Sequence, residues 1–154
     1  MPIEFIQGNI FDSKLQTLVA AVNTRGIAGA GIVLQFKHHF PGWFNDYLNK
    51  CKSGEIKIGS PALYKSTDQW VLNFPTKDDW RQPFKIEYIS AGLKTFVDKY
   101  EEWGITSIAL PALGSGLGGL PWPKVEKLMV NHLSKCKIPV HIYLPIELKG
   151  ISNG

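Results

Sequence analysis

Two glycine-rich segments and one lysine-centred segment hold the residues of this chain that could do chemistry. The first glycine segment reads NTRGIAGAGIVLQF and contains Gly26, Gly29 and Gly31. Glycines let backbone N–H groups approach an anion closely, above all where a helix begins. The pattern predicts a phosphate-binding loop, although glycines also serve simply for tight turns and close helix packing.

The second glycine segment reads PALGSGLGGLPW and formally matches GxGxxG at Gly114, Gly116 and Gly119. A Rossmann dinucleotide site is disfavoured, because that motif opens its fold and needs an acidic residue about twenty positions later. No Walker lysine follows, which also disfavours a P-loop. Two such loops, each after a buried strand, could instead close on a pyrophosphate from both sides.

The third segment reads NFPTKDDWRQPF and centres on Lys77. A lysine acts as a nucleophile only when neutral, which burial or a nearby cation favours. Arg81 could supply that cation, whereas Asp78 and Asp79 would oppose the effect if they point inward. A solvated loop lysine is the plain alternative. The chain has fifteen lysines but only two arginines, Arg25 and Arg81, whose planar forks suit phosphate or carboxylate.

Two asparagines stand where predicted strands end. Asn9 follows the first strand, and an asparagine there could read an adenine edge or simply form a turn. Asn23 ends a buried strand, where its amide could bond a ribose hydroxyl or cap the turn. The residue types alone leave both pairs of alternatives open.

The elements that must position these residues alternate between strand and helix. Apolar runs predict strands at 3–7, 18–22, 62–64, 70–74, 107–110 and 140–143. Helical spacing and glycine or proline boundaries predict helices at 29–39, 43–48, 85–103 and 123–133, with polar or glycine-rich loops at 75–83 and 111–121. This order predicts an α/β sandwich with a largely parallel or mixed sheet. Ligands of such sheets lie beyond the carboxyl ends of the strands, where 8–9, 23–31 and 111–119 fall together.

Composition sets the outer bounds. A length of 154 residues suits one domain, and 44% hydrophobic with 19% charged residues excludes a disordered chain. The net charge of +4 favours phosphate-bearing partners, although dispersed lysines mainly confer solubility. Cys51, Cys136 and four histidines offer no disulfide framework and no metal-binding spacing. Without a signal peptide or an apolar run of roughly 20 residues, the expected setting is reduced and cytoplasmic.

Taken together, VNTRGIAGAGIVLQFK, LNFPTKDDWR and ALPALGSGLGGLPW resemble the macrodomain family. The resemblance runs from QGNIF near the start to HIYLP near the end, and is greatest to the DarG branch. It implies an ADP-ribose-binding, three-layer α/β/α fold with a central mixed sheet, occupying 1–148 and followed by a loose tail at 149–154. The NFPTK-x-x-WR stretch is the marker of the branch that also contains the human terminal ADP-ribose glycohydrolase.

The resemblance implies a role for individual residues. Lys77 matches the catalytic lysine of this branch. Asn9 stands at the adenine, Asn23 near the distal ribose, and Tyr143 is a wall for adenine or its ribose. The other implied ligand-binding residues flank the strand ends and form the two diphosphate loops: Gly8, Ile10, Thr24, Arg25, Gly29, Ala30, Gly31, Ile32, Pro75, Thr76, Arg81, Gly114, Ser115, Gly116, Leu117, Gly118 and Gly119.

The implied activity is that of an antitoxin: a DNA ADP-ribosyl glycohydrolase that removes ADP-ribose from a modified base in single-stranded DNA. Two alternatives stay open: a hydrolase of protein-linked ADP-ribose esters or O-acetyl-ADP-ribose, and a non-catalytic ADP-ribose-binding module. The implied partners are ADP-ribose, ADP-ribosylated single-stranded DNA and a DarT-like toxin. We expect a monomer with no membrane partner, no metal and no cofactor, because ADP-ribose is itself the substrate moiety and product.

Overall fold

The computed structural model of the chain describes residues 3–29, 31–115 and 119–145. The predicted tail at 149–154 lies outside these residues. So do four predicted ligand-binding residues, Ala30, Gly116, Leu117 and Gly118. Within the described residues, no helix is both long enough and apolar enough to cross a membrane.

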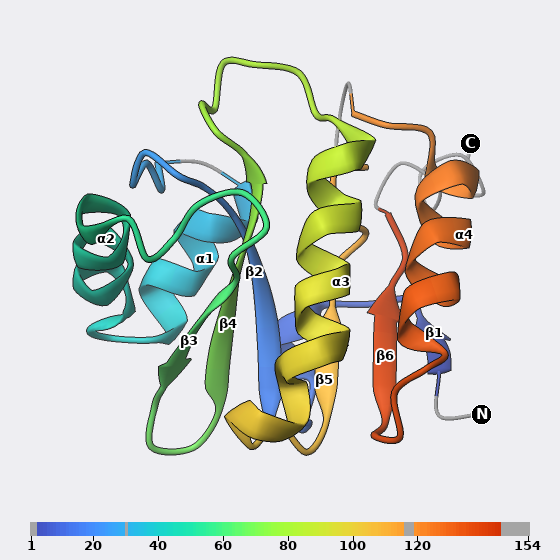
Figure 1. Cartoon of the computed structure of the whole chain (residues 1–154). Helices are drawn as coiled ribbons and strands as arrows, with labels where there is room; N and C mark the ends of the chain where they lie inside the picture. The colour runs from blue at the N-terminus through green and yellow to red at the C-terminus, as the bar shows by residue number, and fades with distance from the viewer. Residues whose placement is uncertain (1–2, 30, 116–118, 146–154) are drawn as a thin grey trace.

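A six-stranded mixed sheet forms the centre of the molecule (Figure 1). Its strands are β1 (Ile3–Ile6), β2 (Thr17–Asn23), β3 (Ala62–Lys65), β4 (Trp70–Lys77), β5 (Ile108–Leu110) and β6 (Val140–Tyr143), in the spatial order β1-β6-β5-β2-β4-β3. Only β3 runs antiparallel to its neighbour. The predicted mixed sheet is therefore confirmed.

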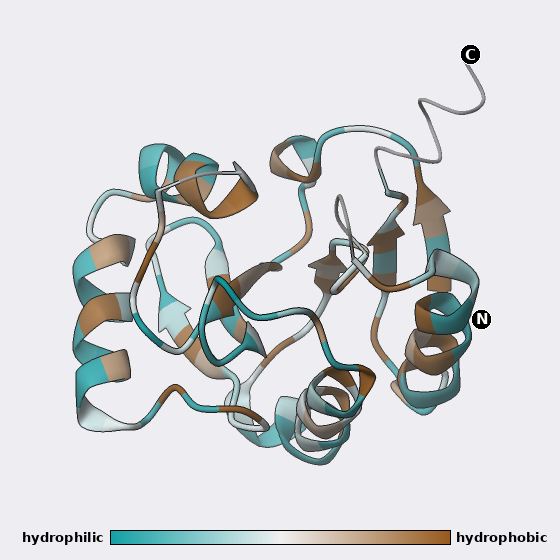
Figure 2. Cartoon of the chain, turned by 90° about the horizontal axis from the view of Figure 1, so that it is seen from above, coloured by the Kyte–Doolittle hydropathy of each residue, from teal (hydrophilic) through white to brown (hydrophobic). Residues whose placement is uncertain are grey.

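In the described residues, four α-helices cover the two faces of the sheet. They are α1 (Gly31–His39), α2 (Trp43–Ser53), α3 (Ile86–Trp103) and α4 (Trp122–Leu133), and a short 3-10 helix, η1, spans Ile10–Asp12. Apolar residues of α3 and α4 pack on one face, and those of α1 and α2 pack on the other. Seen from above, the strands are mostly apolar while the helices alternate apolar and polar faces (Figure 2). The predicted three-layer α/β/α architecture is confirmed.

The bulkiest buried side chains tie each helical layer to β4. Trp43 of α2 is fully buried, and its indole N–H donates to the Asn73 side-chain oxygen at 2.8 Å. On the opposite face, Phe74 fits against Gly92 of α3, where an added Cβ would meet the ring at 2.4 Å. A small residue is thus required at 92, and both layers together fix the strand that leads to Lys77.

Two predicted boundaries are wrong. The predicted helix at 43–48 ends too early, because α2 continues to Ser53. The predicted loop at 75–83 begins too early, because β4 continues through Pro75 and Thr76 to Lys77, and both of those residues are buried. A proline normally marks the end of a strand, but it is tolerated where the ladder is irregular. Here the β2–β4 register shifts between Val22 and Asn23, and β3 pairs with β4 only as far as Asn73. The extension brings Lys77 into register with Asn23.

Candidate functional site

The carboxyl ends of the five parallel strands gather the predicted site residues at one edge of the sheet. Asn23 is the last residue of β2, Lys77 of β4 and Tyr143 of β6. Residues 8–9 follow β1, and the loop that starts at Pro111 follows β5. This edge is where α/β sheets bind ligands.

Asn23 organises the first glycine loop. Its side-chain oxygen accepts from the backbone N–H groups of Arg25 at 2.9 Å and Ile27 at 3.3 Å, and its amide donates to the Ile27 carbonyl at 2.9 Å. Gly26 adopts a φ of +80°, which favours glycine, and an added Cβ would meet Leu48 at 2.7 Å. The turn alternative for Asn23 is therefore observed, while its predicted contact with ribose stays a prediction.

A buried tyrosine supports this loop from α2. The Tyr47 hydroxyl donates to the Asn23 carbonyl at 2.7 Å and lies 3.1 Å from its side-chain oxygen. Burial raises the pKa of Tyr47 well above its usual value, and burial also raises the pKa of the neighbouring Cys51 thiol. Both groups stay neutral at neutral pH, so the side chains that pack beneath the loop are polar but uncharged.

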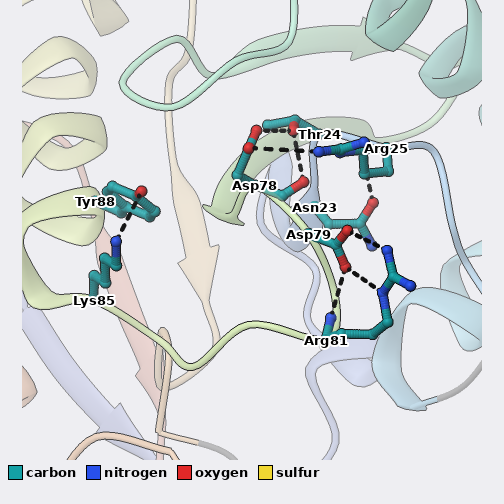
Figure 3. Close-up of polar contacts among 8 residues, drawn as sticks. All are labelled: Asn23, Thr24, Arg25, Asp78, Asp79, Arg81, Lys85 and Tyr88. Atoms are coloured by element: carbon teal, nitrogen blue, oxygen red, sulfur yellow. Dashed lines mark hydrogen bonds and ion pairs between the residues drawn. The ribbon is translucent and has the colours of Figure 1, made fainter.

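Asp78 fastens the first loop to the segment that follows β4 (Figure 3). The Thr24 hydroxyl donates to the Asp78 carboxylate at 2.6 Å and lies 2.8 Å from its carbonyl, and the Thr24 N–H donates to the Lys77 carbonyl at 3.1 Å. The Arg25 guanidinium lies 3.9 Å from the same carboxylate. These contacts turn Asp78 toward the glycine loop.

Asp79 is bound by Arg81 instead. The guanidinium donates to both carboxylate oxygens, at 3.0 and 2.7 Å, and the Arg81 N–H adds a third bond at 2.9 Å. This arginine holds the pKa of Asp79 well below its usual range, and Asp79 in turn raises the pKa of Arg81. The cation that the sequence offered to Lys77 is thus engaged by Asp79 (Figure 3).

Within the described part of the chain, the half-buried Lys77 side chain has two weak partners. Its ammonium nitrogen lies 3.4 Å from the Trp80 carbonyl oxygen and 4.0 Å from the centre of the Phe84 ring. Among the residues that the structure describes, no carboxylate lies within 4.0 Å of it. The contact with the Trp80 carbonyl is solvent-exposed, so the plain alternative of a solvated lysine stays open beside the catalytic one.

A hydrogen bond joins the described residues on either side of the second glycine loop. The Leu120 N–H donates to the Gly114 carbonyl at 2.8 Å, and Ser115 is buried. Gly114 has a φ of +66°, and an added Cβ would lie 2.5 Å from Ile89 and 3.4 Å from Phe84. A side chain at 114 would therefore be strained as well as crowded. Phe84 lies against this glycine.

The first strand end holds a second turn-forming asparagine. The Asn9 side-chain oxygen accepts from the Phe11 N–H at 3.0 Å and caps η1, whose first residue, Ile10, is buried. Asn9 itself is exposed. The turn role of Asn9 is therefore observed, whereas its contact with adenine stays a prediction. Tyr143 is buried, and its contact with adenine or the adjoining ribose also stays a prediction.

Features away from this edge offer less chemistry. A cavity of about 510 Å³ lies at the opposite edge, beside the β3–β4 turn. Several of its polar groups have internal partners: the Gln69 amide donates to the Ser13 and Leu15 carbonyls, and the Tyr64 hydroxyl donates to the Pro41 carbonyl. The described residues hold no group of three or more histidines, cysteines and acids suited to a metal.

Sequence reasoning missed three contributors to the site. Tyr47 has the spacing of any residue on the apolar face of a helix, and no motif in the sequence indicates a role for Phe84. Asp79 was noted only as an opponent of Lys77, although a carboxylate two residues before an arginine is a pattern that permits a closed turn. Each acts through a neighbour in space, which residue spacing alone does not reveal.

Comparison with known proteins identifies this arrangement. The family model for the Macro domain matches residues 19–129. The chain belongs to the macrodomain family.

Relatives of this macrodomain include a DNA ADP-ribosyl glycohydrolase of Thermus aquaticus, 39% identical over 150 residues, which cover 94% of this chain and 42% of the relative. The chain thus spans about two fifths of the length of that relative. The solved macrodomain of Thermus aquaticus DarG superposes with a TM-score of 0.85 at 37% identity, covering 93% of this chain and 97% of that one. Thermosipho africanus DarTG, solved in complex with ADP-ribose, gives a TM-score of 0.90 at 41% identity, covering 94% of this macrodomain and 42% of that chain. The resemblance to the DarG branch is confirmed.

Proposed function

We propose that this macrodomain is a DNA ADP-ribosyl glycohydrolase that removes ADP-ribose from a base of single-stranded DNA. The observation that carries the proposal is the place of Lys77. It ends β4 at the edge where both glycine loops lie, and its amine has no carboxylate partner among the described residues. The names of the relatives and the DarTG complex with ADP-ribose support the substrate class.

Hydrolysis breaks the bond between the anomeric carbon of the distal ribose and a nitrogen of the base. Water supplies a hydroxyl to the carbon, and the base nitrogen takes up a proton as the sugar passes through an oxocarbenium-like state. A group that delivers a proton to the leaving nitrogen contributes roughly 10²–10⁴ in rate. The reaction therefore needs a donor close to that bond.

We assign the donor to Lys77. A carbonyl oxygen at 3.4 Å and the face of an aromatic ring at 4.0 Å are both partners that suit a charged ammonium group. In this resting arrangement the amine can give a proton, whereas attack on the sugar would first require its loss. The nucleophilic alternative is distinguished by the pH dependence described below.

The glycine loops would hold the diphosphate and so fix the ribose before Lys77. Gly26 and Gly114 have the backbone conformations that such loops use, and the first loop is fastened to the lysine segment through Thr24 and Asp78. Arg25, exposed beside the first loop, is a second proposed contact for the diphosphate. No cofactor takes part in this scheme.

Trp80 is the proposed contact for the DNA strand. Its side chain is 55% exposed, although the turn that carries it is closed by hydrogen bonds. Exposed aromatic rings on ordered backbone stack with unpaired bases. We expect Trp80→Ala to weaken hydrolysis of a modified oligonucleotide while leaving ADP-ribose affinity unchanged; equal activity of both proteins on oligonucleotides would remove Trp80 from the proposal.

A substrate comparison tests the proposed activity. The protein is offered an ADP-ribosylated single-stranded oligonucleotide, an ester-linked ADP-ribosyl peptide and O-acetyl-ADP-ribose, and release of ADP-ribose is followed with time. We expect turnover of the oligonucleotide to dominate. Preferred turnover of either ester would indicate the alternative hydrolase, and binding of ADP-ribose without any release would indicate a reader module. A DarT-like toxin stays a predicted partner.

A further inference from the structure

We propose that the Asp79–Arg81 pair and the Phe84 ring are positioning residues that together hold the Lys77 amine. The inference rests on the proposed role of Lys77 and deepens it. The pair fixes the carbonyl that the amine contacts, and the ring bounds the amine on a second side.

The pair fixes that carbonyl by closing a short turn around Trp80. Asp79 accepts three hydrogen bonds from Arg81, and its own carbonyl accepts from the Gln82 N–H at 3.0 Å. Trp80 lies between the bonded residues, so its carbonyl direction is set on both sides. Charge-assisted bidentate pairs of this kind are more directional than neutral hydrogen bonds. Removal of either partner would release the carbonyl.

Phe84 connects the amine to the second glycine loop. The centre of its ring lies 4.0 Å from the Lys77 nitrogen, and its edge faces Gly114, where an added Cβ would come within 3.4 Å of the ring. The ring thus fills the space between the lysine and the loop proposed to hold the diphosphate. In the proposed complex, the position of the ring would set the distance between the amine and the diphosphate.

The same contacts control which charges reach the amine. Asp78 and Asp79 are next to Lys77 in sequence, yet one is turned to Thr24 and Arg25 and the other to Arg81. A carboxylate released from its arginine would be free to neutralise the amine. The arrangement therefore leaves the Lys77 amine without a carboxylate partner among the described residues, although two acids follow it closely in the chain.

Arg81 has a competing role that the test must separate. Its side chain is 69% exposed, and the sequence offered it as a ligand for the substrate. If Arg81 binds the substrate directly, its substitution should raise KM, and Asp79 would serve only to restrain the arginine side chain. If Arg81 instead positions the lysine, its substitution should lower kcat, and the effects of substituting Asp79 and Arg81 should not add.

The experiment measures kcat and KM on an ADP-ribosylated oligonucleotide for Asp79→Asn, Arg81→Gln, the double variant and Phe84→Leu. We expect each single change to lower kcat roughly three- to tenfold, the equivalent of one lost hydrogen bond, with KM nearly unchanged. The double variant should be no slower than either single one. Glu102→Gln, which removes the acid of an exposed pair on α3, is the matched control and should behave as the parent protein.

A raised KM for Arg81→Gln with normal turnover of Asp79→Asn would overturn the inference in favour of a ligand role. A second readout does not depend on activity: the rate at which an amine-reactive reagent labels Lys77, followed by mass spectrometry at fixed pH. Both Asp79→Asn and Phe84→Leu should change this rate by about two- to tenfold, while the thermal midpoint moves little. Unchanged labelling overturns the positioning role even if Lys77 is catalytic, and altered labelling supports it even if Lys77 is not.

Discussion

Lys77 and Lys50 are both half-buried, and the difference between their surroundings separates function from structure. The Lys50 ammonium lies 2.7 Å from the Asp46 carboxylate and donates to the Leu63 carbonyl at 2.7 Å, which ties α2 to β3. Lys77 has a longer contact with one carbonyl and the face of a ring. A lysine that stabilises a fold is neutralised by its partners, whereas a lysine that acts on a ligand must be left available.

Two acids follow Lys77 in the chain without pairing with its amine, because each of them is bound elsewhere. Arg25 and Thr24 hold Asp78, and Arg81 holds Asp79. The two arginines of the chain therefore do not crowd the lysine as extra cations. They bind the two carboxylates that would otherwise neutralise it.

The largest expected effect is the loss of activity in Lys77→Ala. We expect single-turnover hydrolysis of an ADP-ribosylated oligonucleotide to fall by roughly 10²–10⁴, because the proton donor is removed. The free energy of unfolding should change by less than about 0.5 kcal/mol, since no strong contact is lost. Hydrolysis at the parental rate would remove Lys77 from the mechanism.

For Lys50→Met we expect the opposite of Lys77→Ala: a loss of stability without a loss of activity. It leaves the Asp46 carboxylate without its partner, and we expect the free energy of unfolding to fall by about 1–3 kcal/mol. Urea denaturation measures the change. Hydrolysis by the folded protein should stay at the parental rate, and a variant that is stable but inactive would break the contrast between the two lysines.

The pH dependence of turnover separates the two chemistries of Lys77. If Lys77 is the proton donor, turnover should fall as the pH rises, because only the protonated amine can give a proton. If Lys77 is the nucleophile, turnover should rise with pH, because only the neutral amine can attack. Rates under single-turnover conditions, with folding checked by circular dichroism at each pH, decide the sign.

Thr24→Val tests the link between the two loops. The substitution keeps the side-chain volume but removes the hydroxyl that bonds Asp78. We expect a loss of about 1 kcal/mol of stability and a fall in kcat of roughly three- to tenfold. An increase in KM alone would indicate that Thr24 contacts the ligand and does not act through Asp78.

The smallest expected effect is on stability at low pH. The pKa of Asp79 is depressed in the folded protein, so the stabilisation by its pair with Arg81 is complete above the unfolded pKa, about 3.9, and is lost as the pH falls below that value. Asp79→Asn should therefore show a shallower loss of stability than the parent between about pH 4 and pH 2. Denaturant midpoints measured across that range test the expectation, and parallel curves would contradict it.

Much of the fold follows from local patterns in the sequence. The apolar run before Asn23, the glycine at 104 and the proline at 123 mark boundaries that recur in the structure. Pro75 misled the prediction, because its buried place in β4 depends on a register shift against β2 and on the early end of β3. Whether a proline such as Pro75 lies in a strand depends on how that strand pairs with its neighbours. The sequence of one strand alone does not show this pairing.

In the candidate site too, the sequence indicates some of the residues but not those that support them. Glycine loops and Lys77 stand out by residue type, and parallel strands bring them to one edge. The supports of that edge, such as Tyr47 beneath Asn23 and Phe84 beside Lys77, come from helices and loops whose approach is set by tertiary packing. Their roles became visible only once distances were known.

The most direct test of the account is a crystal structure of the protein bound to ADP-ribose. We expect the diphosphate to lie between the two glycine loops and the anomeric carbon of the distal ribose to lie about 3–4 Å from the Lys77 amine. A terminal ribose far from that amine, with Lys77 pointing into bulk water, would contradict it and leave a protein that binds ADP-ribose without acting on it.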